Sequence, residues 1–311
     1  MRLTLSLAIV FVFLPQLSLM AELPFLTVAE NVLAGPTAAA IEDDRVLCLW
    51  VAASGPENTP QVMGAYFTKT YDAWFGPRLM IRDTEKVSEV SLIRQPDSPV
   101  LWLVTVEGAP DARGVYLRQS ENHGASWSSR TALHTGGTDY TLGNAAFLGE
   151  DRLVVGAIER GNDGRDKLLL ISGSPDEGWR AASPPEISAG KWSAPVLLPA
   201  PEGMMAYVTS SDAPRRYFRS RSASGREWSR LEAANLPSAV KEATPVRSLA
   251  LLPVDDDRVL IAGNDNVAEP GTLSIGFSYD GGRTWPLRRP ALFDAPEARP
   301  VLVSTGDGFH A

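Results

Sequence analysis

Apolar and polar residues alternate in short runs along most of the chain, and the runs recur at a regular spacing. Three runs rich in valine, leucine, isoleucine and tyrosine lie at residues 89–93, 100–106 and 114–118. The same arrangement of three runs returns over residues 144–172 and 246–277. Runs of this length, bounded by glycine, proline, asparagine and aspartate, are typical of β-strands. Because no long segment has apolar residues at helical spacing, the pattern predicts an all-β protein.

An eight-residue turn motif follows the third run near the end of the chain. Residues 278–285 read S-Y-D-G-G-R-T-W, and the motif positions are Ser278, Asp280, Gly282 and Trp285. A short aspartate side chain at a turn can accept hydrogen bonds from the backbone N–H groups just ahead of it. The glycines can adopt positive φ, and the tryptophan is large enough to pack between neighbouring sheets. The motif therefore predicts a structural turn and not a catalytic centre.

Weaker copies of this motif recur upstream. One copy has asparagine in place of the aspartate and keeps Ser120, Asn122, Gly124 and Trp127. Shorter or degenerate copies end at Trp74, at Trp179 (with Asp176) and at Trp228. The five motif tryptophans are 53, 52, 49 and 57 residues apart. Even spacing of this kind indicates an internal repeat.

Each repeat has three strand-like runs before the motif and one after it, which is the unit of a β-propeller blade. Five units take the chain to about residue 292, and a sixth begins at residues 299–304. Because an open sheet edge invites aggregation, we expect residues 23–28 to supply the outer strand of the sixth blade. The sequence predicts a single β-propeller domain over residues 22–311, six-bladed with an incomplete last blade.

The first 21 residues have the pattern of a secretory signal peptide. Met1 and Arg2 give a positive start, residues 3–14 are apolar, and Ala21 is a small residue suited to cleavage. The apolar run is shorter than the roughly 20 residues that a membrane-spanning helix needs. We expect cleavage near Ala21 and a secreted or periplasmic mature protein without a membrane span.

Composition excludes several classes of function. The chain has 311 residues and a formal net charge of −8, with no basic run, so nucleic acid is not an expected partner. Cys48 is the only cysteine, which leaves no intramolecular disulfide. The three histidines lie far apart without metal-ligand spacing, and no phosphate loop or nucleophile elbow occurs. We expect neither a metal nor a cofactor.

Candidate functional residues follow from the two faces of a propeller. The motif turns lie on one face, so we expect a site among the loops of the other, which include residues 134–141 and 159–166. The candidates are Asp139 with Tyr140, Glu159 with Arg160, Glu242 with Arg247, and Glu297 with Arg299. Each pair also has a plain alternative as an exposed salt bridge, a turn or a solvated run of charge.

From about residue 34 to its end, the chain resembles the secreted BNR-repeat sialidase-like proteins. The resemblance rests on the motif turns, known as Asp-boxes, on residues 259–264 and 273–277 before the last box, and on residues 297–310. It implies a six-bladed propeller. For active sialidases it implies three arginines on the sugar carboxylate, a tyrosine nucleophile assisted by a glutamate, and an aspartate acid/base. Guanidinium groups match a carboxylate bidentately, and a neutral tyrosine adds no second anion beside it.

Two family motifs are not matched. Residues 34–37 read A-G-P-T where the family has Arg-Ile-Pro, and Arg299-Pro300 stands where the family has Tyr-Pro. The candidates for substrate binding are Arg160, Arg247, Arg299, Tyr140 and Glu242. The candidates for catalysis are Glu297, Asp139 and Glu159.

The sequence therefore predicts a sialidase-like propeller that binds a carbohydrate or glycoconjugate, with an acidic sugar among the candidates. The unmatched motifs argue against hydrolysis. Two alternatives stay open, a non-catalytic scaffold for protein interaction and an active exo-sialidase-like glycosidase that uses carboxylates. A rim of exposed aromatic and aliphatic side chains would favour the scaffold. Two carboxylates about 5–9 Å apart would favour the glycosidase.

Overall fold

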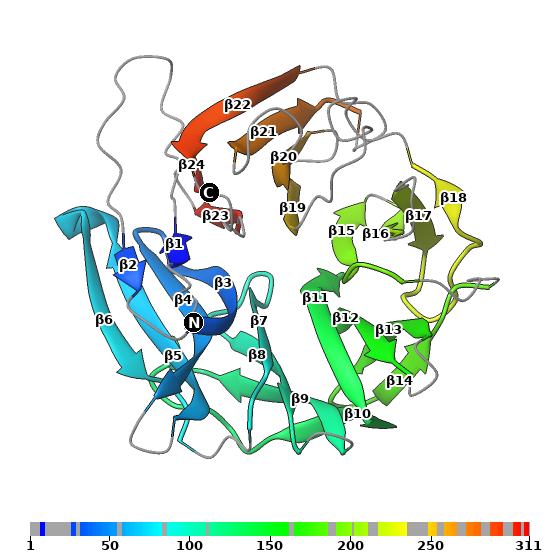
Figure 1. The fold of residues 1–311 in the computed structure, drawn as a ribbon, viewed down its shortest axis with the longest axis horizontal. Helices are drawn as coiled ribbons and strands as arrows, with labels where there is room; N and C mark the ends of the chain where they lie inside the picture. Colours follow the sequence, from blue (N-terminus) through cyan, green and yellow to red (C-terminus); the bar gives the residue numbers. More distant parts are fainter. Residues whose placement is uncertain are drawn as a thin grey trace, which may run out of the picture.

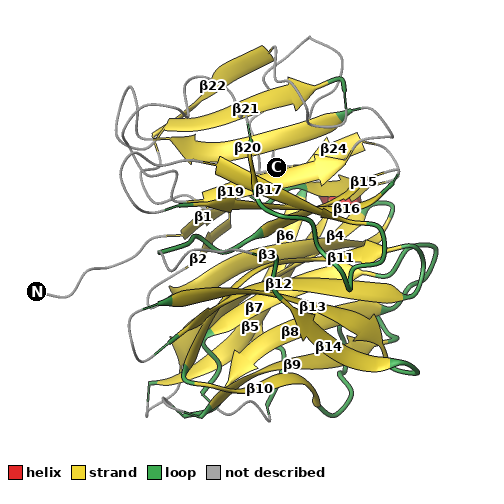
Figure 2. Ribbon diagram, turned by 90° about the vertical axis from the view of Figure 1, so that its right-hand side faces the viewer, coloured by secondary structure: helices red, strands yellow, loops and turns green. Residues whose placement is uncertain are grey.

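The computed structural model describes residues 7–9, 26–28, 32–54, 58–82, 86–109, 112–161, 165–185, 191–200, 202–210, 217–234, 248–253, 258–265, 272–280, 287–294, 301–305 and 308–310. Strands dominate these ranges, and the short 3-10 helix η1 (Lys69–Tyr71) is the one helix among them (Figure 2). None of the described residues form a helix long and apolar enough to cross a membrane. The predicted all-β class is confirmed.

Five antiparallel four-stranded sheets stand around a central axis as the blades of a propeller (Figure 1). Blade 1 consists of β3 (Val32–Glu42), β4 (Arg45–Ser54), β5 (Thr59–Thr68) and β6 (Ala73–Leu79). Blade 2 consists of β7 (Glu89–Arg94), β8 (Leu101–Glu107), β9 (Arg113–Ser120) and β10 (Thr131–Gly137). Blade 3 consists of β11 (Asp139–Leu148), β12 (Arg152–Arg160), β13 (Asp166–Ser174) and β14 (Gly178–Ala182).

The last two blades repeat this order. Blade 4 consists of β15 (Val196–Ala200), β16 (Gly203–Thr209), β17 (Tyr217–Ser222) and β18 (Glu232–Ala233). Blade 5 consists of β19 (Ser248–Pro253), β20 (Val259–Asp265), β21 (Thr272–Ser278) and β22 (Leu287–Asp294). In every blade the strands follow chain order from the axis outward, so β3, β7, β11, β15 and β19 are the inner strands.

The predicted count of six blades is wrong for the described residues, which form five. β23 (Val303–Thr305) and β24 (Gly308–His310) make a separate two-stranded sheet between blade 5 and blade 1 (Figure 1). The sequence predicts that residues 23–28 supply the outer strand of this last blade, and this prediction is wrong. β2 (Leu26–Val28) pairs with β1 (Leu7–Ile9) instead. With three residues each, β23 and β24 supply only a hairpin. β1 lies within the predicted signal peptide, whose cleavage stays a prediction.

Apolar cores lie between neighbouring blades. Leu101 and Leu103 of blade 2 pack with Leu47 and Leu49 of blade 1, and similar clusters join blades 2 and 3, blades 3 and 4, and blades 4 and 5. On its other side, blade 1 packs against Val303 of the C-terminal hairpin. Because each sheet buries both faces, its middle strands read as nearly continuous apolar runs in the sequence.

The Asp-box turns connect the third strand of a blade to the fourth. In the box of blade 2, Asn122 Oδ1 accepts a hydrogen bond from Ser126 N (2.9 Å), and Ser120 Oγ accepts one from Gly124 N (2.9 Å). Gly124 has φ +84°. In the last box Ser278 Oγ donates to Asp280 Oδ1 at 2.8 Å, and the predicted motif positions Gly282 and Trp285 lie outside the described residues.

The box tryptophans pack into the core shared with the preceding blade. Trp127 of blade 2 packs on the blade 1 cluster, Trp179 of blade 3 contacts Trp102 of blade 2, and Trp228 of blade 4 is buried with blade 3 residues. The face with these turns is termed the box face. The opposite face, where the inner strands begin, is termed the funnel face.

Candidate functional site

A central cavity of about 900 Å³ lies along the propeller axis. Its walls are the inner strands of the five blades together with residues 301–303. The lining runs from Glu89 and Arg160 at the funnel face to Arg94 near the box face, and these three are the charged residues among the described lining residues. A cavity of this size is within the usual range for small-molecule sites. It is therefore the main candidate for a binding site in the described part of the chain.

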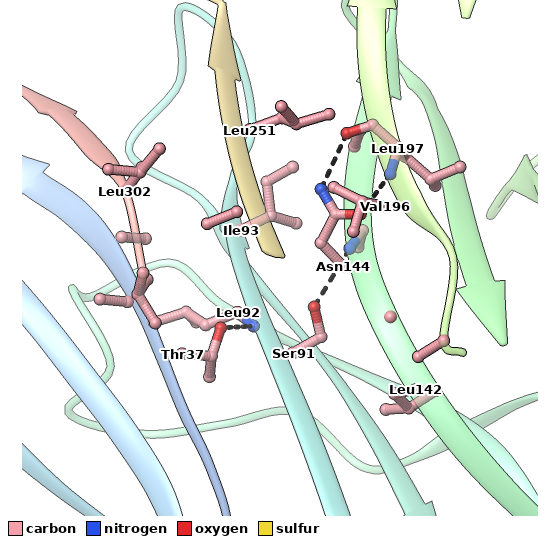
Figure 3. A pocket seen from close by; sticks show the side chains of 18 of the residues that line it. Thr37, Ser91, Leu92, Ile93, Leu142, Asn144, Val196, Leu197, Leu251 and Leu302 are labelled. Atoms are coloured by element: carbon pink, nitrogen blue, oxygen red, sulfur yellow. Dashed lines mark hydrogen bonds between the residues drawn. The ribbon is translucent and has the colours of Figure 1, made fainter. Parts of the chain in front are cut away.

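Polar side chains in the middle of the cavity bond one inner strand to the next (Figure 3). Leu92 N donates to Thr37 Oγ1 (2.8 Å), Ala145 N to Ser91 Oγ (3.1 Å), and Leu197 N to Asn144 Oδ1 (2.6 Å). Asn144 Nδ2 also donates to Leu197 O at 2.9 Å. The inner strand of a blade has an edge without a neighbouring strand, and these side chains satisfy backbone groups along it.

The corresponding positions in blades 4 and 5 and before β23 are apolar. They are Val196, Ala250 and Val301, each one residue before the leucine that matches Leu92 of blade 2. Aliphatic side chains cannot accept a hydrogen bond. The middle of the cavity therefore has a polar wall at blades 1 to 3 and an apolar wall at blades 4 and 5 and the hairpin.

Four of the sequence candidates meet at the funnel end of blade 3. Asp139 lies opposite Arg160, and Tyr140 opposite Glu159, on the paired strands β11 and β12. We expect these residues in loops from the sequence, whereas β11 begins at Asp139 and β12 runs to Arg160. The strand ends could not be read from local residue types, because pairing with a neighbouring strand overrides the local preference for a turn. Only Thr138 separates β10 from β11.

Asp139 forms an ion pair with Arg113 of blade 2 and accepts a hydrogen bond from Tyr140 N at 3.0 Å. The two charged side chains are 23% and 37% exposed for Arg113 and Asp139, so solvent screens the pair only in part. Arg113 is the first residue of β9 and bridges to the first residue of β11. The negative charge of the Asp139 carboxylate is thus balanced by the guanidinium of Arg113 in the neighbouring blade.

Tyr140 is buried, with 2% of its surface exposed. Its hydroxyl accepts a hydrogen bond from Gly137 N at 2.7 Å, and the His134 ring packs edge-on against it at 5.9 Å between centroids. Burial raises the pKa of Tyr140, and the nearby Glu159 carboxylate acts in the same direction. In this arrangement Tyr140 packs blade 3 and has no exposed ring face for a sugar, so its predicted stacking role has no support in the geometry.

Gly137 makes room for both polar groups of this cluster. A Cβ atom there would lie 2.3 Å from the Tyr140 hydroxyl and 2.6 Å from Glu159 Oε1. The Glu159 carboxylate therefore lies beside the tyrosine, and Lys167 Nζ is 3.8 Å from its other oxygen. The side chain of Glu159 is 19% exposed, so a group at the funnel face can reach it only in part.

Arg160 differs from these neighbours because it is exposed and lines the cavity. Its backbone carbonyl accepts a hydrogen bond from Thr138 Oγ1 at 2.8 Å. Within the described ranges no carboxylate pairs with its guanidinium. An arginine in this state has its donors available to an anionic group.

The remaining candidates lie outside the described residues. Glu242, Arg247, Glu297 and Arg299 belong to this group, so their roles stay predictions. Within the described ranges no three histidine, cysteine, aspartate or glutamate side chains are grouped as ligands for a metal ion.

Sequence reasoning missed a buried charge cluster in blade 2. Glu107 and Arg118 form an ion pair with neither side chain exposed, Thr105 Oγ1 donates to Glu107 Oε1 at 2.6 Å, and Arg130 Nη1 lies 3.2 Å from Glu107 Oε2. Arg130 also lies over the Tyr116 ring at 4.7 Å. A charged residue inside an otherwise apolar strand, such as Arg118, is the signal that could have revealed the cluster. Its bonds join β8, β9 and the segment before β10, so its role is to hold blade 2 together.

Comparison with solved structures identifies the fold. A Hadza microbial sialidase, Hz136, has a TM-score of 0.65 and 13% identity over 86% of this chain and 60% of its own. The Trypanosoma rangeli sialidase, solved with sialic acid, has a TM-score of 0.62 and 13% identity over 92% and 54%. The SapL1 lectin, solved with α-methyl fucoside, has a TM-score of 0.55 and 14% identity over 88% and 85%.

At these identities the likeness shows the fold alone, and the chain spans little more than half the length of the two sialidases. No curated protein sequence matches the chain. The model of the BNR repeat-like domain, however, matches residues 44–310, which include all five blades except the first part of blade 1. The chain therefore belongs to the BNR repeat-like domain family, as a divergent sialidase-like propeller.

Proposed function

We propose that this protein binds a carbohydrate at the funnel face, with an acidic sugar as the first candidate. The observation that carries the proposal is Arg160, an exposed guanidinium that lines the central cavity without a carboxylate partner in the described ranges. Arginine binds carboxylates with two parallel hydrogen bonds. Support also comes from the structural neighbours. Two of them are named as sialidases, and a third is a lectin that was solved with a bound fucoside.

A protein-interaction scaffold has less support. The exposed aromatic pair Tyr71 and Phe75, with ring centroids 6.2 Å apart, lies at the connection between β5 and β6. That connection is the position of the box turn, so these rings do not form a rim around the funnel end of the cavity. The carbohydrate proposal therefore has the stronger site.

Replacement of Arg160 by alanine tests the proposal. We expect wild-type protein to bind sialic acid or glucuronic acid, and Arg160→Ala to bind about tenfold or more weakly, since a charge-assisted hydrogen bond contributes about 1.5–3 kcal/mol. Isothermal titration calorimetry measures both. The matched control is Arg180→Ala, an exposed arginine on the outer strand β14 of the same blade.

The control should bind as wild type. Equal affinity of the two arginine variants would contradict the assignment of Arg160, and absence of binding to either acid, with no binding of methyl α-fucoside, would overturn the carbohydrate proposal. Turnover belongs to a separate arm of the same experiment. We expect no cleavage of a fluorogenic sialoside, because Arg299-Pro300 replaces the tyrosine motif and Asp139 is paired with Arg113. Cleavage that is lost in Glu159→Gln would instead support a glycosidase.

A further inference from the structure

Among the described lining residues, the middle of the central cavity has uncharged polar side chains at blades 1 to 3, whereas its mouth has the charged Glu89 and Arg160. The side chains of Thr37, Ser91 and Asn144 already accept backbone hydrogen bonds from the next inner strand. These uncharged side chains hold neighbouring inner strands together. The middle of the cavity is therefore less polar than its mouth, where Glu89 and Arg160 lie.

The opposite wall offers aliphatic surface. Figure 3 shows Leu302, Ile93 and Leu251 around the same space, with the bonds of Thr37, Ser91 and Asn144 at its edge. Val196 and Ala250 extend this wall at the positions where blades 1 to 3 have polar side chains. The wall is continuous with the funnel end, since the same cavity includes Arg160 and Thr141.

We propose that this cavity binds the apolar aglycone of a glycoconjugate whose sugar lies at the funnel face. The inference rests on the proposed carbohydrate binding and adds a ligand class to it, namely glycosides with an alkyl or acyl chain. The polar mouth and the aliphatic middle match the two ends of such an amphiphile. Pockets that bind small molecules commonly combine apolar walls with a few convergent polar groups.

The affinity of glycosides with different chain lengths tests this inference. Methyl and octyl glycosides of glucuronic acid and of sialic acid would be titrated below the concentrations at which they form micelles. Each methylene removed from water strengthens binding about three- to fourfold, so three buried methylenes would give about 30-fold or more. We expect the octyl glycoside to bind that much more tightly than the methyl glycoside.

Two variants locate the chain in the cavity. Ala250→Leu narrows the middle of the cavity, and Val196→Thr replaces a methyl group by a hydroxyl with little change of shape. Both should reduce the octyl-to-methyl affinity ratio by about tenfold and leave methyl glycoside binding unchanged. The matched control is Ala132→Leu, an exposed alanine on the outer strand β10. Val196→Thr keeps the test usable if Ala250→Leu does not fold.

The outcomes separate the two proposals. Methyl and octyl glycosides that bind equally well would overturn the aglycone inference and leave carbohydrate binding intact. A preference for octyl that survives both cavity variants would overturn the placement of the chain in this cavity. If no glycoside binds, carbohydrate binding and the aglycone inference both fail.

Discussion

Tyr140 and Tyr207 are two buried phenols whose surroundings favour the neutral form. Burial raises the pKa of each, with Glu159 adding to the effect at Tyr140 and with Arg219 and Arg221 opposing it at Tyr207. A free tyrosine ionises near pH 10 in an unfolded chain. The unfolded state therefore loses these protons at a lower pH than the folded state does. The stability that the two phenols contribute is present below about pH 10 and is lost as the pH rises through their folded pKa values.

Tyr140→Phe removes both the ionisable phenol and its hydrogen bond with Gly137, and the two effects on stability appear at different pH values. At neutral pH the variant should unfold about 1 kcal/mol more easily, because Gly137 N loses its acceptor. Between pH 9.5 and 11 its free energy of unfolding should fall less steeply than that of the wild type. Urea denaturation at a series of pH values measures both changes.

Tyr207→Phe should show the same shallower slope, whereas Tyr71→Phe, at a residue 71% exposed, should leave the slope unchanged. A Tyr140→Phe slope identical to that of the wild type would contradict the assignment.

Among the strands and turns, the glycine of an Asp-box has both a special conformation and a close neighbour. Gly124 has φ +84°, and a Cβ there would lie 2.6 Å from Leu47 Cδ2 of blade 1. Gly149, in the turn between β11 and β12, has φ +71° with nothing within 4 Å of a built Cβ. The two glycines share the positive φ and differ in the contact with a neighbouring blade.

Alanine at each position therefore separates backbone strain from steric contact. Gly149→Ala should cost about 1–2 kcal/mol, the penalty for a non-glycine residue with left-handed backbone. Gly124→Ala should cost a further 1–3 kcal/mol or so, because Leu47 must move. Chemical denaturation of both variants gives the difference. Equal losses would show that the box turn does not press against blade 1.

The strands could be predicted from the sequence where their apolar runs recur in each repeat. The runs at residues 89–93 and 114–118 appear as β7 and β9, because an apolar strand between two cores keeps its pattern regardless of partner. The strand end at Asp139 was not predictable, since its pairing with Arg160 depends on a neighbouring strand. The same holds for the ion pair with Arg113, which joins residues from two blades.

Asn144 could have been found by comparing repeats. It occupies the same place as Ser91 and Thr37 in the two preceding inner strands, 53 and then 54 residues earlier. A polar residue recurring at one position of an otherwise apolar strand indicates a shared hydrogen bond. The central cavity, in contrast, depends on how the inner strands are spaced around the axis, which no local pattern reports.

In the molecule as a whole, the C-terminal hairpin covers one side of blade 1. Val303 packs against the cluster that contains Cys48 and Trp50, and Val301 and Trp74 lie at its border. Cys48 has no exposed surface, and burial raises the pKa of its thiol. Since only the thiolate reacts readily, the cysteine reports whether this side of blade 1 is covered.

Val303→Ser should speed the labelling of Cys48 by a thiol reagent at pH 8, because serine lacks both methyl groups of valine and adds a hydroxyl, which weakens the packing of the hairpin on blade 1. Leu302→Ser is the matched control, since Leu302 lines the central cavity and is not part of this cluster. We expect its labelling rate to remain close to that of the wild type. Unchanged labelling in Val303→Ser would show that the hairpin does not protect this side.

Because each box tryptophan packs on the preceding blade, the order of synthesis determines which apolar surface is uncovered at each stage. Trp127 completes the core beside blade 1, and Trp228 completes the one beside blade 3. A blade emerging from the ribosome therefore has one uncovered apolar side until the next repeat, about 50 residues long, has been made. At 5–20 residues per second this wait is on the order of 3–10 s. The growing end of the nascent chain thus presents an unfinished surface that chaperones can recognise and that moves forward by one blade at each step. The other side of blade 1 stays uncovered until the C-terminal hairpin with Val303 has been made.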